Sequence, residues 1–185
     1  MLTTLAKTRD FKENVFKVNI PRTDVRVTIN GRSAPTPFGF GGWVALTSGG
    51  EGSEVLMGDL VLTEAEVNPV MSALLENGLE VTALHNHFFW EQPRIFYMHV
   101  HGRGTIEDLI TRLKPAIAII DKATPGRPAP SAPATAFESL NTQAIATTVG
   151  QPGEQNGPVY KITIGRPDVR AAVAQLGMAP AARIK

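Results

Sequence analysis

The chain has 185 residues, of which 43% are hydrophobic, and its 18 basic and 17 acidic residues give a formal net charge of +1. A chain of this length can form one domain with a sizeable core, or one domain and part of another, and its balanced charge gives no reason to expect nucleic acid or an anionic membrane surface as a partner. Because it contains no cysteine, disulfides, thiolate metal sites, iron–sulfur clusters and cysteine nucleophiles are excluded.

The first half of the chain predicts several β-strands. Residues 15–30 alternate in polarity and are rich in β-branched side chains, which predicts one or two strands broken near Pro21 and ended by a turn at Asn30 and Gly31. After a loop rich in glycine and proline, two more strands are predicted, over residues 43–47 and 54–63.

A first helix should follow these strands. Thr63 and Glu66 have the spacing of a capping box, and Asn68 with Pro69 is an equally good start. Because proline suits the first turn of a helix, we place the start of the regular helix at Pro69. Its apolar stripe is predicted to be Val70, Met71, Leu74 and Leu75.

A second helix is predicted after residue 104. Thr105 and Asp108 can cap it, and Pro115 is expected to bend or interrupt it. Its apolar stripe is predicted to be Leu109, Ile110, Leu113 and Ile117. These elements together predict an α+β fold, in which two helices pack on one face of a mainly antiparallel sheet and a histidine-bearing hairpin lies on the other.

The end of the chain predicts a partial repeat. The segment VFKVNIPRTDVR aligns with VYKITIGRPDVR at residues 159–170, with seven identities in twelve positions. We therefore expect the second copy to pair with a neighbour, and the protein to be a homo-oligomer through this truncated repeat. The predicted organisation is an N-terminal extension (1–13), an α+β unit (14–121), a linker rich in proline and alanine (122–136), and a weak helix ending at Gly150 with the start of a second repeat (137–185).

All four histidines fall in two pairs, His85 with His87 and His99 with His101. Side chains alternate along a strand, so each pair shares a face. A hairpin folded about residues 92–93 would set His87 opposite His99 and His85 opposite His101, with Cβ atoms about 4.5–5.5 Å apart. The histidine face would also carry Val81, Ala83, Phe89, Ile95 and Tyr97, and the other face Leu84, Phe88, Phe96, Met98 and Val100.

Four crowded imidazoles predict a metal site. They repel one another when protonated and need hydrogen bonds when buried and neutral, whereas a divalent metal ion binds neutral imidazole nitrogens at about 2.0–2.1 Å. We therefore predict one divalent ion bound by His85, His87, His99 and His101, with zinc or copper first and iron or manganese as alternatives. Whether three or four histidines bind at once stays open, as does the alternative that they bind nothing and are structural.

Three further residues near the histidines are candidates for catalysis. Glu91 completes an H-x-H-x3-E spacing that resembles the first metal motif of cupins, although the second cupin motif is not found. Glu91 is a further ligand, a general base on metal-bound water, or a solvated turn residue. Arg94 could pair with Glu91, hold an anionic substrate or lie at the surface. Tyr97, on the predicted metal face, could donate a proton or serve only in packing. Asp59 and Glu66 could form an acidic second shell, but capping and surface roles fit them better.

The sequence resembles the LppY/LpqO-type family, named for mycobacterial lipoproteins and described as of unknown function. The resemblance rests on VFKVNIPRTDVRV and on GDLVLTEAEVNPVMSALLENGLEVTALHNHFFWEQPRIFYMHVHG, and it covers about residues 14–120. It implies two such units per protein and an extracytoplasmic location. The chain itself carries no signal-peptide pattern, no lipid-attachment cysteine and no apolar run of bilayer length.

We therefore expect a mononuclear metalloenzyme that performs hydrolytic or oxidative chemistry on a small molecule. The alternative is a non-catalytic metal-binding, storage or structural module of an extracytoplasmic protein. Nucleic acid is not an expected partner, and no membrane span is expected.

Overall fold

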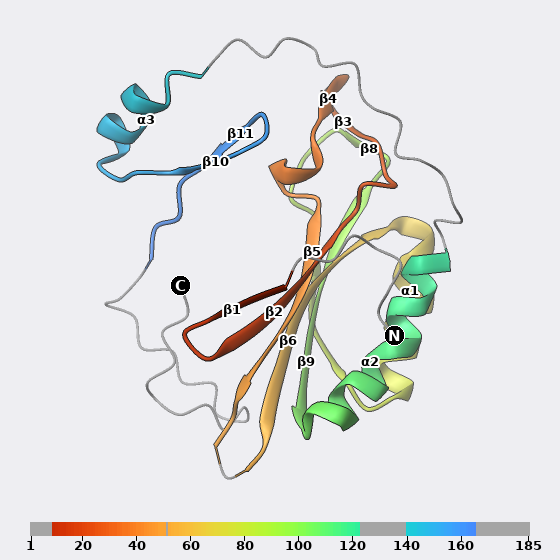
Figure 1. Cartoon of the computed structure of the whole chain (residues 1–185). Helices are drawn as coiled ribbons and strands as arrows, with labels where there is room; N and C mark the ends of the chain where they lie inside the picture. Colours follow the sequence, from red (N-terminus) through yellow and green to blue (C-terminus); the bar gives the residue numbers. More distant parts are fainter. Residues whose placement is uncertain (1–8, 51, 123–139, 166–185) are drawn as a thin grey trace.

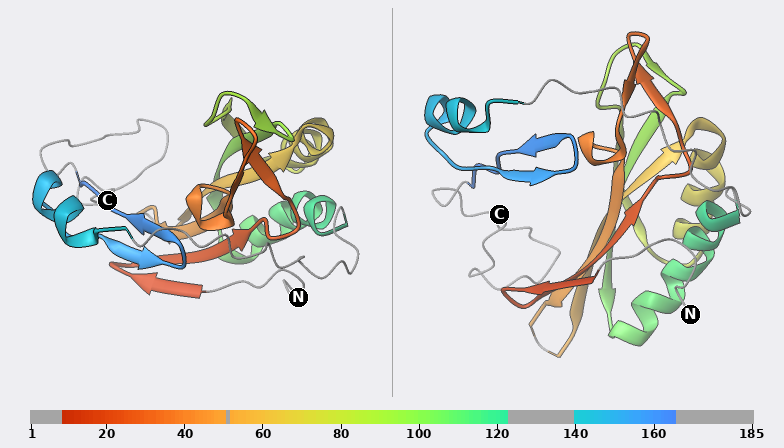
Figure 2. Two further views of the ribbon diagram at one scale, coloured as in Figure 1. Left: turned by 90° about the horizontal axis from the view of Figure 1, so that it is seen from above. Right: turned by 45° about the horizontal axis from the view of Figure 1, so that its top comes forward.

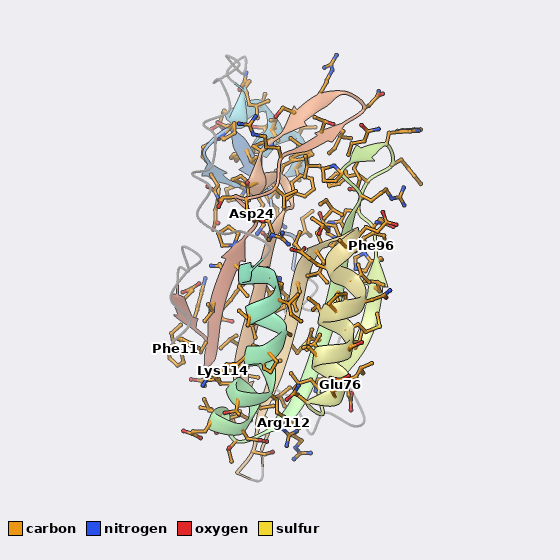
Figure 3. The ribbon with its side chains drawn as sticks, turned by 90° about the vertical axis from the view of Figure 1, so that its right-hand side faces the viewer. Phe11, Asp24, Glu76, Phe96, Arg112 and Lys114 are labelled. Atoms are coloured by element: carbon orange, nitrogen blue, oxygen red, sulfur yellow. The ribbon has the colours of Figure 1, made fainter. Side chains whose placement is uncertain are left out.

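A six-stranded antiparallel sheet organises the computed structural model, which describes residues 9–50, 52–122 and 140–165 (Figure 1). The strands lie in the order β1 (Arg9–Lys12), β2 (Val15–Pro21), β5 (Gly41–Ser48), β6 (Glu54–Thr63), β9 (Ile95–Gly104) and β7 (Glu80–His85). Two helices, α1 (Glu64–Glu76) and α2 (Ile106–Lys122), lie side by side on one face, as Figure 3 shows. The α+β fold with a helix pair on one face is therefore confirmed.

The core lies between the sheet and the two helices. Alternate residues of β6 and β9 point toward the helices, and they pack against the apolar sides of α1 and α2. The most deeply buried members include Leu56, Leu60, Leu62, Leu74, Met98 and Leu109. Leu75, which the helical stripe predicted as buried, is instead 54% exposed.

A second, smaller sheet lies beside one end of the histidine face. It consists of β4 (Arg32–Ala34), β3 (Val27–Ile29) and β8 (Glu91–Gln92), and the 3₁₀ turn η1 (Thr36–Phe38) follows β4. The predicted turn at Asn30 and Gly31 joins β3 to β4, and both residues have positive φ (47° and 75°). A second apolar cluster lies here, formed by Val27, Phe40, Val61, Ile95 and Tyr97.

The first helix begins at Glu64, so the predicted start at Pro69 was wrong. The capping box is formed, and Glu66 Oε2 accepts a hydrogen bond from the Thr63 N–H at 2.7 Å. Pro69 removes only one helical hydrogen bond, and burial of Val67 in the preceding turn stabilises the earlier start. The second helix likewise runs through Pro115 without a break.

A buried arginine ties the end of β2 to the start of α1. The Arg22 guanidinium donates to Glu66 at 2.8 and 3.1 Å, to Asp24 at 2.8 and 2.9 Å, and to the Val61 carbonyl at 2.7 Å. Burial alone would lower the pKa of Arg22, but the hydrogen bonds to the two carboxylates outweigh it and raise the pKa. This charged cluster joins three elements at the edge of the core.

The predicted hairpin around the histidines has a different register. Tyr97 is opposite His85, and His99 is opposite Ala83, in a register that holds from Ala83 to His85; a β-bulge between Val81 and Ala83 then shifts the pairing farther from the hairpin loop. The predicted pairs of His87 with His99 and of His85 with His101 were therefore wrong. The bulge also turns Val81 to the helix face, where it packs against the core, whereas the sequence placed it among the histidines.

The last described elements form a separate unit. They are α3 (Thr142–Val149) and the hairpin of β10 (Glu154–Asn156) with β11 (Val159–Lys161), which lie at the opposite side of the molecule from α1 and α2 (Figure 2). The predicted helix ending at Gly150 is confirmed, whereas the predicted linker lies almost wholly outside the described residues.

The repeat extends into this hairpin. Val159 pairs with Asn156 as Val15 pairs with Lys12, so β10 and β11 repeat the pairing of β1 and β2. The second copy was expected to pair with the first unit or with another chain. Among the described residues, it pairs with the strand directly before it, and the expected pairing with a neighbour stays a prediction. Across those residues, no helix is long and apolar enough to cross a membrane.

Gly102 is expected to be a sensitive position of the sheet. A Cβ there would lie 2.5 Å from Leu79 Cδ2 and 3.0 Å from Leu109 Cδ2. We expect Gly102→Ala to lower the free energy of unfolding by about 1–3 kcal/mol, because two core leucines must move. Gly41→Ala is the matched control, since its Cβ would meet nothing within 4 Å. Urea denaturation measures both, and equal stabilities of the two variants would contradict the packing argument.

Candidate metal centre

Three of the four histidines come together on the face opposite the helices. His85 ends β7, His87 lies two residues beyond it, and His99 lies on the neighbouring strand β9. The Nε2 atoms of His85 and His99 are 2.8 Å apart, and the ring centroids of His85 and His87 are 5.1 Å apart. At 2.8 Å, one imidazole donates a hydrogen bond to the other.

The Tyr97 ring stacks against two of these imidazole rings. The His87 ring stacks on it with centroids 3.3 Å apart, and the His85 ring stacks at 5.8 Å. Tyr97 is 1% exposed, and its hydroxyl has no hydrogen-bond partner among the described residues. Burial raises the pKa of Tyr97, and the charges of Glu91 and Asp59 raise it further. The phenol therefore stays protonated and available as a hydrogen-bond donor.

His101 is apart from the other three histidines. Its Nδ1 lies 3.1 Å from Glu80 Oε2, across the strand pair of β7 and β9. No ring contact joins it to the other histidines in the described part of the chain. Its Nε2 is nevertheless buried without a partner. The carboxylate contact is the kind that orients an imidazole whose other nitrogen binds something else.

Asp59 is a candidate site residue for which the sequence alone favoured a capping or surface role. It lies on β6 directly opposite His99, and its Oδ1 is 4.0 Å from His99 Nε2. This oxygen is buried without a hydrogen-bond partner in the described structure. Burial raises the pKa of Asp59, although the nearby histidines and Lys17 oppose that rise. The available sequence signal was a carboxylate in the middle of the apolar strand EVLMGDLVLT, next to Leu60 in sequence and therefore on the opposite face.

Glu91 is buried, so its interpretation as a solvated turn residue was wrong. It is 2% exposed because β8 pairs with β3. Its Oε1 accepts hydrogen bonds from the Ile95 N–H at 3.1 Å and from Asn86 Nδ2 at 3.4 Å, and its Oε2 has no partner among the described residues. Arg94 is exposed and donates to Asn86 Oδ1 at 3.3 Å. It makes no ion pair with Glu91 within the described ranges.

The unsatisfied polar atoms concentrate around the histidines. Within residues 9–50, 52–122 and 140–165, four buried side-chain atoms lack a hydrogen-bond partner: Asp59 Oδ1, Glu91 Oε2, Tyr97 Oη and His101 Nε2. All four belong to histidine-face strands or to the loop between β7 and β9. Buried polar atoms are rarely left unpaired, so this group indicates a place for a bound ion, water or ligand.

The donor atoms are near one another but do not form a finished coordination shell. Among the described residues, no group of three or more His, Asp or Glu side chains has the arrangement of a metal site. In a tetrahedral zinc shell, neighbouring nitrogens lie about 3.3 Å apart, which is longer than the 2.8 Å hydrogen bond between His85 and His99. Small side-chain rotations would therefore have to accompany metal binding.

His87 has the electrostatic environment of a ligand. Burial lowers its pKa, and the proximity of His85 lowers it further, while Asp59 and Glu91 oppose this. A lowered pKa keeps the imidazole neutral at physiological pH, which is the form that binds metal.

Comparisons with known proteins give a family and no activity. No curated protein and no solved structure matched the chain. A family model described as Domain of Unknown Function (DUF1259) matches residues 2–119. The matched part contains the whole six-stranded sheet and every residue of the candidate site. With more than half of its length matched, the chain belongs to the family described as Domain of Unknown Function (DUF1259).

Proposed function

We propose that this protein binds one divalent metal ion through His85, His87 and His99, with Asp59 as a carboxylate ligand. The observation that carries the proposal is the 2.8 Å approach of the His85 and His99 Nε2 atoms beside an unpartnered, buried Asp59 oxygen. In two neutral imidazoles so close, one Nε2 carries the bridging proton; when that ring carries its proton on Nδ1 instead, both Nε2 lone pairs are free to bind one cation.

The surroundings of the ion support an enzyme. Three nitrogens and one oxygen leave positions for water or substrate on an ion that accepts five or six ligands. Glu91 Oε2 and the Tyr97 hydroxyl supply a buried proton acceptor and donor close to the histidines. Bound zinc would supply an activated water for hydrolysis, whereas copper, iron or manganese would supply oxidative chemistry. Arg94 has no role in this proposal, because it lies at the surface and contacts Asn86.

A non-catalytic metal-binding module is the second candidate. The free Nε2 of buried His101 favours it, because a fourth imidazole would close the shell as the sequence alone predicted. The resemblance to LppY/LpqO-type proteins supports an extracytoplasmic location for either function. The duplicated segment at residues 159–170 further suggests assembly of copies through the repeat.

Calorimetric titration of the EDTA-treated and dialysed protein with zinc, copper and manganese tests the proposal. We expect binding of one equivalent with a dissociation constant in the micromolar range or below, and a measured heat that varies with the ionisation enthalpy of the buffer because protons are released. A protein that takes up none of the three ions would refute it. An ion whose spectrum shows four nitrogen ligands and no exchangeable water would favour the non-catalytic module.

Asp59→Asn is expected to stabilise the metal-free protein and, at the same time, to weaken metal binding. Because burial raises the pKa of Asp59, the folded protein holds this proton more tightly than the unfolded chain. The associated stabilisation is present at low pH and is lost as the pH rises through the folded-state pKa. At pH 7.5 the ionised carboxylate therefore destabilises the metal-free protein, and asparagine removes that charge.

The metal-free variant should melt higher than the wild type at pH 7.5, by roughly 2–4 °C for a gain of about 1 kcal/mol. The difference should shrink as the pH falls through the folded-state pKa of Asp59, because the wild-type carboxyl then becomes protonated in the folded protein. Zinc affinity should fall at least about tenfold. Thermal melts with EDTA and zinc titrations measure the two effects. Unchanged zinc affinity would remove Asp59 from the ligand set.

A further inference from the structure

Aromatic rings lead from the histidine site toward solvent. Phe88 contacts the edge of His87 with ring centroids 6.2 Å apart, and Phe38 stacks on Phe88 at 5.7 Å. Phe40, which is buried, contacts Phe88 with ring centroids 5.6 Å apart. Gly39 brings the backbone after η1 close to the same place, since a Cβ there would lie 3.9 Å from His87 Nδ1. Phe38, at the outer end of this row, is 50% exposed.

Two more aromatic side chains follow directly after Phe88. Phe89 is 79% exposed and Trp90 is 74% exposed, and their rings lie 5.7 Å apart. We call Phe38, Phe88, Phe89 and Trp90 the aromatic lip. Large aromatic side chains are costly to leave in water, and exposed ones in the loop that carries His87 mark a contact surface.

The lip is held by backbone contacts. The Asn30 N–H donates to the Trp90 carbonyl at 3.1 Å, and the next residue, Glu91, pairs with Ile29 in the small sheet. Trp90 itself has φ of 55°, in the left-handed region, where a bulky residue is strained and glycine is not. Local strain of this kind is typical of functional positions, because the fold alone would be served as well by glycine.

We propose that the aromatic lip binds the apolar part of a small amphiphilic substrate, whose polar group reaches the metal ion. This inference rests on the metal site proposed above and adds the chemical class of its substrate. The contact of Phe88 with His87 makes the apolar surface continuous with a ligand of the ion, so one small molecule can touch both. A lipid surface would use the exposed rings without requiring that continuity.

Two hydroxamates test the substrate class, because both chelate the metal through the same group. Acetohydroxamate carries a methyl group, whereas 2-naphthohydroxamate carries a large aromatic group. With the zinc-loaded protein, we expect the naphthyl compound to bind on the order of tenfold more tightly than the methyl compound. Calorimetry of each compound against wild type and variants gives this ratio directly.

Trp90→Gly and Phe89→Ala should reduce the ratio to about threefold or less and leave acetohydroxamate binding unchanged. Glycine relieves the left-handed strain at position 90, so loss of fold is not an expected effect of that variant. Phe11→Ala is the matched control, since Phe11 is 70% exposed on β1, away from the site, and should keep the full ratio.

A ratio near one in the wild type, or a full ratio in both lip variants, would overturn the inference while zinc binding stands. Absence of zinc binding in the same titrations would remove the metal site and the inference with it. Sedimentation with phosphatidylcholine vesicles adds a further outcome. Vesicle binding that Trp90→Gly abolishes would assign the lip to a membrane surface instead.

Discussion

His99→Ala is expected to lower the affinity for zinc at least about 100-fold, and His85→Ala should have the same effect. Replacing a residue that merely orients a ligand costs about 10–100-fold in affinity, so removal of a ligand should cost more. These two imidazoles have their Nε2 atoms 2.8 Å apart, so each contributes a donor atom on the same side of the sheet. The His99 side chain is 36% exposed, so alanine there should leave the fold intact.

The zinc affinity of His101→Asn, compared with that of His99→Ala, distinguishes three histidine ligands from four. If three histidines and Asp59 hold the ion, this variant should retain affinity within about tenfold, because His101 contacts Glu80 and no other histidine ring in the described structure. If the loss equals that of His99→Ala, all four imidazoles bind, as the sequence alone predicted. Retention of full affinity by both His85→Ala and His99→Ala would mean that the ion lies elsewhere. Circular dichroism melts of each variant exclude unfolding as the cause.

Arg22→Ala is expected to destabilise the protein by about 3–5 kcal/mol. Its side chain is 2% exposed, and alanine would leave the nearly buried carboxylates of Glu66 and Asp24 without their cation. The Val61 carbonyl would also lose a donor. The effect should appear as a lower denaturation midpoint in urea with an unchanged slope.

Arg112→Ala is the control for this second prediction. Arg112 also pairs with an aspartate, Asp108, at 2.6 Å, but both side chains are more than one-third exposed. An exposed pair four residues apart on a helix contributes only about 0.3–0.5 kcal/mol. Similar losses from both arginine variants would show that burial does not control the strength of the Arg22 cluster.

The two stability predictions concern positions far from the proposed ion. Neither Gly102 nor Arg22 contacts a proposed ligand, so their variants should keep one zinc site per folded molecule. Loss of zinc binding in a folded Gly102→Ala protein would indicate that the sheet geometry around His101, its neighbour on β9, is coupled to the site.

Local pattern was enough to predict several elements and the faces of many of their residues. The strand over residues 54–63 has the expected bounds, since its alternation and its flanking turn signals depend only on neighbours in sequence. The same holds for the capping box of Thr63 and Glu66, whose atoms are three residues apart. The two-residue spacing also determined that His99 and His101 share a face of β9.

Local pattern could not rank competing signals. Thr63 and Pro69 both mark a helix start, and the decision came from contacts that the sequence does not display. Glu66 is drawn into the Arg22 cluster, and Val67 is buried against the core. These long-range contacts extended the helix across a proline that local preference placed at its first turn.

By itself, the sequence determined the α+β fold, the helix pair on one face and the collection of histidines on the other. Only the tertiary structure decided which residues meet around them. The observed strand register set His85 opposite Tyr97, pairing of β8 with β3 buried Glu91, and β6 carried Asp59 opposite His99. The physical reason is that periodicity fixes the direction of a side chain, whereas cross-strand neighbours depend on register and strand order, which are set by burial of the whole core.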